Sequence, residues 1–172
     1  WLPAGTALQT LQAGRVLMKE FPFASCVPFS AGGALSTDGG AERSGVLFRA
    51  AGHDPAPDVL LAQLEKLLRL DTPDALRYVD ARHGQRRVAR LVRAGSDAHL
   101  EAVLLGGDTR AEAWIKPLLQ QRLPAQALGR QLLRPGATAA AGVTSRGKVV
   151  CSCFGVSESA IRRVLCKAGG TD

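Results

Sequence analysis

Aromatic residues are scarce in this chain, and long hydrophobic runs are missing. Only 5% of its 172 residues are Phe, Trp or Tyr, while 46% are hydrophobic. A core built from this composition must consist mostly of leucine, valine and alanine. No run approaches the roughly 18 apolar residues of a membrane-spanning helix. The opening residues lack the charged head and long apolar stretch of a secretory signal peptide. These absences argue against a membrane-spanning or secreted protein.

Cysteine is also scarce and unevenly placed, at Cys26, Cys151, Cys153 and Cys166. This is not the pattern of a secreted disulfide framework, and a reducing, cytoplasmic setting fits better. The chain opens on Trp1 and closes on "AGGTD" without a terminal element, so we expect an excerpt from a longer polypeptide. The net charge of +7 favours acidic partners without choosing among them.

The first third of the chain gives mixed signals. We expect an irregular region with one or two strands over 1–57. Prolines interrupt the apolar run 21–29, which is typical of an edge strand or an extended loop. The run 44–51 reads as a strand. Asp58 is a candidate N-cap for a helix over 58–70, whose leucines recur at helical spacing.

A compact unit follows the predicted helix. Short turns join three strand-like runs at 76–81, 85–93 and 99–107, which predicts an antiparallel meander. Two helices then follow over 108–121 and 124–133. Asp108 is the candidate N-cap of the first helix, and Pro117 predicts a kink or break inside it.

The fold class expected is α+β, with a small antiparallel sheet packed by three helices. The meander and one or two N-terminal strands would form the sheet of a domain spanning 1–133. The Pro- and Gly-containing stretch 134–148 reads as a linker. A short segment, 149–172, follows it.

The closing segment carries two cysteines, Cys151 and Cys153, separated by one serine. Ser157 is a natural N-cap, and Glu158 would lie in the first turn of a helix. Thiolates near a helix N-terminus gain from its dipole and its free N–H groups, so the pair is suited to hold an iron–sulfur cluster. A zinc site, or thiols that act only as small hydrophobic groups, would give the same spacing.

The stretch "VVCSCFGVSESAIRRVL" (149–165) resembles the opening of the bacterioferritin-associated-ferredoxin-like 2Fe–2S module. The resemblance implies that Cys151 and Cys153 are metal ligands. It also implies a second pair, C-x-x-C, about 30 residues further on. Cys166 matches no ligand position. In this chain alone we therefore expect no cluster and a disordered or rearranged tail.

The resemblance extends backward through "LRYVDARHGQRRVARL" (76–91) and "LEAVLLGGDTRAEAWIKPLLQQRLPAQALGRQLLRPGA" (100–137). Both are similar to the C-terminal region of bacterial assimilatory nitrate reductases, as are "PFASCVPFS" (22–30) and "ERSGVLFRAAGHDPAPDVLLAQLE" (42–65). These are cytoplasmic molybdopterin enzymes that carry a 2Fe–2S module after the catalytic body. A related unit precedes the same module in flavin-dependent nitrite reductases, which is the alternative.

The resemblance implies a non-catalytic part of an enzyme that reduces nitrate to nitrite. Molybdopterin guanine dinucleotide and a 4Fe–4S cluster would lie elsewhere in the parent enzyme. The 2Fe–2S module would accept electrons from a reductase or a ferredoxin-like donor. No catalytic residue can be placed on this chain, because none of its motifs matches the molybdenum-binding body.

Another possible role rests on a dense group of arginines, which could form a basic ribbon for nucleic acid or dock an acidic electron-transfer protein. Only Tyr78 lies nearby for base stacking, so nucleic acid is not expected and we favour a solvated sheet face. The group consists of Arg77, Arg82, Arg86, Arg87, Arg90 and Arg93.

The remaining polar candidates favour structural roles. No metal spacing joins His53, His83 or His99 to a cysteine, and the last two are expected to be exposed near turns. Cys26 is expected to be a packed core thiol. The "GGDT" turn at 106–109 lacks a phosphate-loop pattern, and Trp114 is expected to anchor its helix on the sheet.

Overall fold

The computed structural model describes residues 2–29, 43–138, 149–151 and 156–168. Short 3₁₀ turns lie at Met18–Glu20, Ala81–His83 and Gln126–Leu128. None of the helices in these ranges is long and apolar enough to cross a membrane. The elements, in chain order, are β1 (Leu2–Pro3), α1 (Ala4–Leu17), β2 (Phe23–Phe29), β3 (Arg43–Ala51), α2 (Asp58–Leu67), β4 (Leu76–Asp80), β5 (Gln85–Ala94), β6 (Asp97–Gly106), α3 (Glu112–Gln121), α4 (Gly129–Leu133), β7 (Val149–Cys151), β8 (Val156–Ser157) and α5 (Glu158–Ala168).

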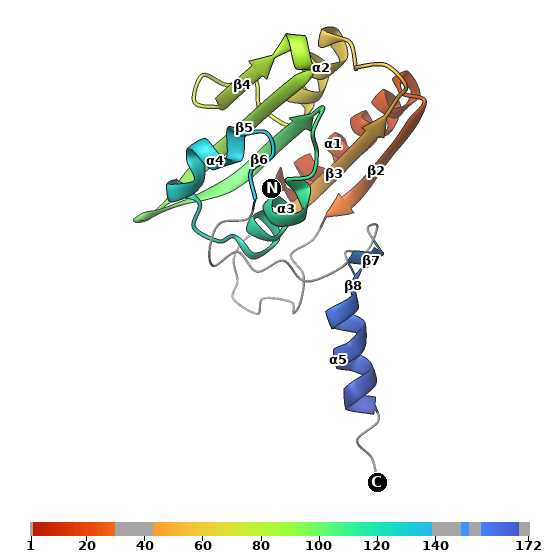
Figure 1. Cartoon of the computed structure of the whole chain (residues 1–172), viewed down its shortest axis with the longest axis vertical. Helices are drawn as coiled ribbons and strands as arrows, with labels where there is room; N and C mark the ends of the chain where they lie inside the picture. Colours follow the sequence, from red (N-terminus) through yellow and green to blue (C-terminus); the bar gives the residue numbers. More distant parts are fainter. Residues whose placement is uncertain (1, 30–42, 139–148, 152–155, 169–172) are drawn as a thin grey trace.

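The strands form two three-stranded antiparallel sheets and one small hairpin (Figure 1). The first sheet has the order β1-β3-β2, and the second is the meander β4-β5-β6. Gly84 and Gly95 adopt left-handed backbone conformations, with φ of 60° and 66°, in the two turns of the meander. The predicted α+β fold and its three-stranded meander are thus confirmed.

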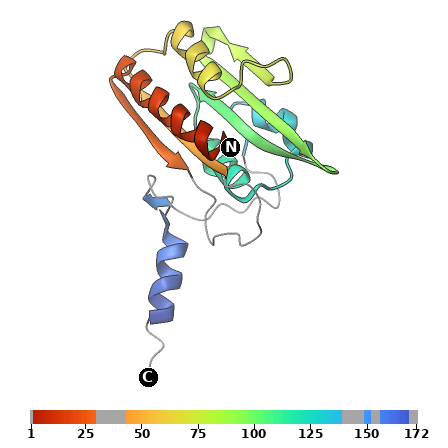
Figure 2. The ribbon, with the colours of Figure 1, turned by 180° about the vertical axis from the view of Figure 1, so that it is seen from behind.

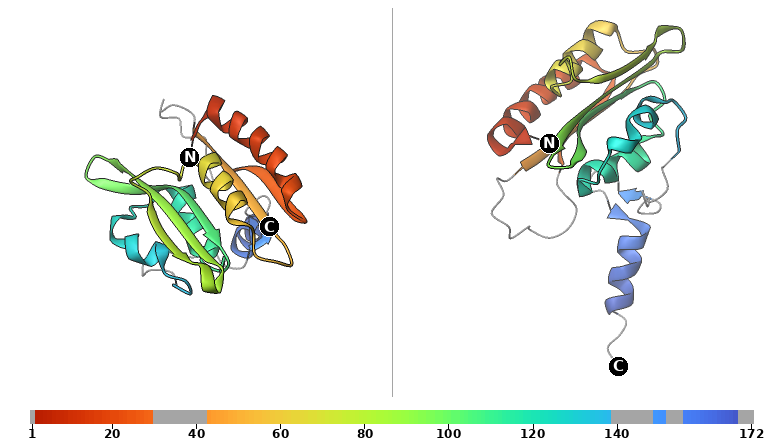
Figure 3. Two further views of the ribbon diagram at one scale, coloured as in Figure 1. Left: turned by 90° about the horizontal axis from the view of Figure 1, so that it is seen from above. Right: turned by 90° about the vertical axis from the view of Figure 1, so that its left-hand side faces the viewer.

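Helices cover the strands from two sides. Figure 2 shows α1 and α2 against one side, and Figure 3 shows α3 and α4 on the opposite side. The alternation of side chains in β5 explains this arrangement, because neighbouring residues of a strand point to opposite faces. Val88 packs with Leu64 of α2, whereas Ala89 packs with the cluster under α3 and α4.

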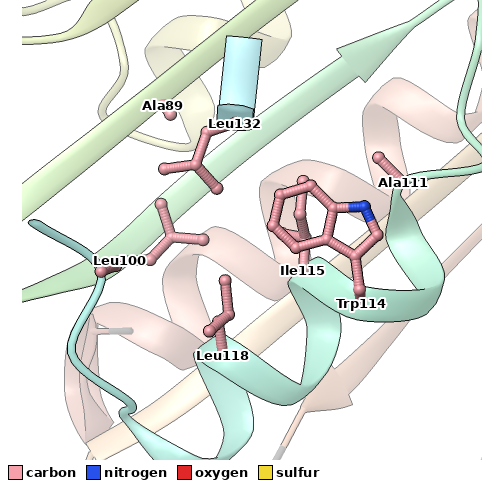
Figure 4. Packing of buried hydrophobic residues seen from close by; sticks show 8 residues of the cluster. Ala89, Leu100, Ala111, Trp114, Ile115, Leu118 and Leu132 are labelled. Atoms are coloured by element: carbon pink, nitrogen blue, oxygen red, sulfur yellow. The ribbon is translucent and has the colours of Figure 1, made fainter. Parts of the chain in front are cut away.

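The core under α3 has few aromatic residues, as the composition requires. Trp114, Ile115 and Leu118 of α3 point toward Leu100 of β6 and Leu132 of α4 (Figure 4). All five side chains are buried, so the predicted anchoring role of Trp114 is confirmed. This packing fixes α3 against the meander on the face opposite α2.

Three local predictions at the helices need correction. The helix predicted over 108–121 begins only at Glu112 and continues through Pro117 without a break in its assignment. Asp108 therefore precedes the helix and does not cap it. Asp58 is the first helical residue of α2, and no side chain caps that helix. The segment predicted as helix over 124–133 consists of a 3₁₀ turn followed by α4.

Helix α1 was not predicted, because its buried face has few large apolar residues. Ala7, Thr10, Leu11 and Gly14 are its buried positions, and their spacing is helical. A threonine and a glycine on that face hide the apolar stripe that identifies a helix in a sequence. The expectation of an irregular and strand region over 1–57 was therefore wrong for Ala4–Leu17.

Helices α2 and α3 both end on an arginine in the left-handed conformation. Arg69 has φ of 56°, and Arg122 has φ of 49°. After α2, the N–H of Arg69 donates to the carbonyl of Lys66 (3.1 Å), and the N–H of Leu70 donates to that of Glu65 (2.7 Å). These two bonds form a Schellman motif, and Leu70 following the arginine is fully buried.

Gly14 allows α1 to approach β2 closely. A Cβ at this position would lie 2.6 Å from the Sγ of Cys26. We predict that Gly14→Ala lowers the free energy of unfolding by about 1–2 kcal/mol, because a well-packed core does not absorb an added methyl group. Urea unfolding followed by circular dichroism measures the change.

Gly5→Ala is the matched control on the same helix, since no atom lies within 4 Å of a Cβ there. Its expected effect is neutral or slightly stabilising. Adding Cys26→Ala to Gly14→Ala should restore part of the loss by removing the clashing sulfur. Equal losses in the two glycine variants would contradict the close approach.

Candidate functional site

The cysteine segment forms a hairpin followed by a helix. Strand β7 ends at Cys151, which pairs with Val156 of β8, and β8 leads directly into α5. The register shifts between Val149 and Cys151, as at a β-bulge. Cys153 lies outside the described residues. The helix predicted here is present as α5.

Helix α5 separates Cys166 from the hairpin. A helix rises about 1.5 Å per residue, so Cys166 lies roughly 12 Å along the axis from Glu158. Cys166 is a free, exposed cysteine. Glu158 pairs with Arg162 one turn later, at 2.8 Å. That Cys166 is not a ligand of the same centre as Cys151 stays a prediction.

The chemistry of the hairpin fits half of an iron–sulfur site. Cys151 supplies one thiol at the strand that pairs with the entry to α5, and Cys153 follows two residues later in sequence. Helix N-termini favour thiolates, the form in which cysteine binds iron. A 2Fe–2S cluster takes four protein ligands, so this pair would supply two of them.

Asp108 connects three parts of the domain at the point where the chain leaves it. Its carboxylate accepts hydrogen bonds from the backbone N–H of Arg110 (3.0 Å) and of Gly136 (3.1 Å). Its backbone N–H donates to Oε1 of Gln85 (2.9 Å), and its carbonyl accepts from the guanidinium of Arg87 (3.0 Å). The turn before α3, strand β5 and the segment after α4 are thus tied to one residue.

The glycine before Asp108 is required by a close backbone approach. Gly107 has φ of 80°, and a Cβ there would lie 2.5 Å from the carbonyl oxygen of Gly84. This agrees with the expectation that the "GGDT" turn has a structural role. Without glycine, β6 could not turn toward α3 beside the β4–β5 turn.

Two more hydrogen bonds hold the segment that follows α4. Nε1 of Trp114 donates to the carbonyl of Ala137 (3.0 Å), and Nε2 of Gln131 donates to that of Thr138 (2.9 Å). The stretch predicted as a linker over 134–148 is therefore bound to the domain through Thr138. Residues 139–148 lie outside the described part of the chain.

Arg87 is the most deeply buried charged side chain of this region. It is fully buried, and its Nε and Nη1 have no hydrogen-bond partner among the residues that the structure describes. Burial lowers the pKa of its guanidinium, an effect that the nearby Asp108 carboxylate opposes. The hydrogen bond from Arg87 to the carbonyl of Asp108 stabilises the turn before α3 from the inside of the domain.

The expectation of a solvated arginine face was wrong for three of the six arginines, since Arg87 is buried and Arg86 and Arg90 are partly buried. Glu65, buried on α2, accepts hydrogen bonds from Arg77 and from Nε of Arg86 (2.6 Å). Arg90 pairs with Glu101 at 3.0 Å. Together with Arg87, four of the six arginines have a carboxylate or carbonyl partner within the domain, while Arg77, Arg82 and Arg93 are exposed.

Sequence reasoning missed the role of Glu65, although a signal was present. Leu61, Leu64 and Leu68 mark the apolar stripe of α2, and Glu65 lies within that stripe at helical spacing. A carboxylate on a buried face needs a charged partner, and the arginine-rich neighbouring strands supply it.

The histidines and Cys26 have structural surroundings. His83 pairs with Asp80 at 2.7 Å on the surface, and His53 contacts the edge of Phe23. Nδ1 of His99 is buried, which corrects the expectation that this residue is exposed. Cys26 is buried as predicted, and burial raises the pKa of its thiol.

Comparison with protein-family models, with curated proteins and with solved structures gave no match to this chain.

Glu65 is expected to be more important for stability than its exposed neighbour Asp58, which pairs with the same arginine. The Glu65 side chain is 5% exposed, and that of Asp58 is 89% exposed. We predict that Glu65→Gln lowers the free energy of unfolding by about 2 kcal/mol, because it removes the buried carboxylate that pairs with Arg77 and leaves Arg86 only the exposed carboxylate of Asp58. Asp58→Asn should change it too little to resolve, since exposed pairs contribute little. Equal urea midpoints for the two variants would disprove the difference.

Asp108 is expected to make the domain sensitive to acid. Hydrogen bonds and charge from Arg110 hold the pKa of its carboxyl well below the ordinary value. A depressed folded-state pKa gives stability that is present above the unfolded pKa, near 4, and is lost as pH falls below it. Asp108→Asn should therefore lower the urea midpoint most at pH 7 and progressively less below pH 4. A loss that is the same at pH 7 and pH 3 would count against this carboxylate.

Proposed function

We propose that this chain is a non-catalytic C-terminal part of a molybdenum-dependent assimilatory nitrate reductase. In this proposal the α+β domain connects the catalytic body to an electron-accepting 2Fe–2S module that begins at β7. The parent enzyme would work in the cytoplasm and reduce nitrate to nitrite. Its electron donor would be a reductase or a ferredoxin-like protein.

The hairpin whose first strand, β7, ends at Cys151 carries the proposal. A cysteine on the strand before a helix start is suited to cluster binding, and Cys153 follows it two residues later in the sequence. When bound, the cluster would supply one-electron transfer, while this chain would hold two of its iron ligands and set its position.

The hydrogen bonds that hold residues 134–138 against the domain support a role in positioning the cluster. Contacts of Asp108, Trp114 and Gln131 fix where the chain leaves the domain toward the cysteines. A relay protein needs its cluster within reach of the next centre, so a fixed point of departure serves that purpose. The equivalent region of a flavin-dependent nitrite reductase would use the same arrangement.

The proposal predicts that cluster binding depends on one pair of cysteines and not on the third. The parent polypeptide should be expressed through about forty residues beyond Asp172, so that it includes the second ligand pair. We expect visible absorption and two irons per chain. Cys151→Ser and Cys153→Ser should each remove most of the absorption.

Cys166→Ser is the matched control, since it changes an exposed thiol on the neighbouring helix. It should retain both the colour and the iron. A colourless, iron-free parent polypeptide would overturn the proposal, as would equal loss of iron in all three variants.

A further inference from the structure

Helices α1 and α2 border an open groove on the outer side of the domain, where Figure 2 shows them next to each other. The volume of the groove is about 550 Å³. Most of its lining is apolar, from Ala13, Val16, Leu17, Leu60 and Leu67. Val16 is 67% exposed, so the described part of the chain leaves this wall of the groove uncovered.

The two helices run in opposite directions along the groove. A Cβ at Gly14 would lie 3.6 Å from Cδ2 of Leu67, so the end of α2 lies against α1 near position 14. From there the groove extends forward along α1 to Glu20 and backward along α2 to Leu60. Lys66 therefore lies at one end of the groove, and Glu20 lies at the other.

Helix α5 has an apolar stripe that the described part of the chain leaves uncovered. Ile161, Val164 and Leu165 recur at the spacing that places side chains on one face of a helix. Their exposed fractions are 37%, 66% and 64%. Figures 1, 2 and 3 all show α5 extending away from the domain. A contiguous exposed apolar surface of this kind is typical of a contact with another surface.

The stripe and the groove match in length and in charge. Helix α5 has 11 residues and α2 has 10, so the two are nearly equal in length. Glu158 and Arg162 pair one turn apart on α5, each three residues before a member of the stripe. The order of charge along α5 is therefore acidic and then basic. Along α1, from the Lys66 end of the groove to Glu20, the order is basic and then acidic.

This order of charges selects one orientation of α5 in the groove. A helix that packs parallel to α1 brings Glu158 toward Lys66. The same orientation brings Arg162 toward Glu20. The reverse orientation would bring charges of the same sign together at both ends, which opposes binding.

We propose that the groove between α1 and α2 binds α5 of a second copy of this chain. The exchange is reciprocal, so two copies bury two stripes in two grooves about a twofold axis. Removal of the apolar side chains from water favours the association, and the symmetry doubles this contribution. Because α5 extends away from its own domain, its stripe is available to another molecule. Neither Cys151 nor Cys153 takes part, so the inference does not rest on the proposed function.

Sedimentation equilibrium of the full 172-residue chain in reducing buffer tests the proposal. We expect a dimer with twice the 18.1 kDa mass of one chain. Val16→Asp in the groove and Leu165→Asp on the stripe should each raise the dissociation constant roughly tenfold or more, because each places a charge in an apolar contact. Leu8→Asp and Cys166→Ser are the matched controls, since they change exposed side chains of the same two helices outside the groove and the stripe. Both should leave the dissociation constant unchanged.

A mixture of the two variants tests the reciprocal exchange. The Val16→Asp chain keeps an intact stripe, and the Leu165→Asp chain keeps an intact groove. We therefore expect mixed pairs at concentrations at which neither variant associates alone. Circular dichroism spectra that coincide with that of the unaltered chain exclude misfolding as the cause of a lost dimer.

A monomeric 172-residue chain would overturn the proposal, as would a dimer that neither substitution weakens or a mixture that forms no pairs. In the parent polypeptide extended beyond Asp172, the rest of the proposed 2Fe–2S module is the competing occupant of the stripe. A dimer that becomes a monomer in that longer polypeptide would assign the stripe to the module and would also overturn the proposal. Iron content reports separately on the proposed function.

Discussion

The contacts of Asp108 are the constraint on which the arrangement of the C-terminal half depends. This one residue binds the strand β5, the turn into α3 and the segment that follows α4. Hydrogen bonds to a charged carboxylate are stronger than those between neutral groups. The positions of β5, of α3 and of the segment that follows α4 are therefore coupled through this residue.

A second constraint is the ionic layer between α2 and the meander. Glu65 is buried in this layer and pairs with the partly buried Arg86 and with the exposed Arg77. Such pairs add little stability relative to apolar residues but specify which surfaces pack together. Half of the arginines that suggested a binding surface are thus buried or partly buried.

Much of the fold could be predicted from the sequence where the signals are local. Short turns and apolar runs gave the meander, and leucine spacing gave α2. Helix α1 could not be found in this way, because Thr10 and Gly14 on its buried face conceal the stripe. The role of Asp108 depends on Gln85 and Gly136, which are distant in sequence and come together only through the fold. For the cysteine segment, the local sequence pattern predicted the helix that became α5. The pairing of Cys151 with Val156, which lies just before α5, was found only in the structure.

Arg69 and Arg122, at the ends of α2 and α3, adopt a left-handed backbone conformation for which arginine is not the ideal residue. Glycine is the usual residue in this conformation, and a longer side chain costs about 1 kcal/mol there. Arginine recovers part of that cost through its charge at the negative end of the helix dipole. A change of either arginine to glycine would therefore raise the free energy of unfolding. Descendants of this sequence could gain stability in this way without any change to the packed core.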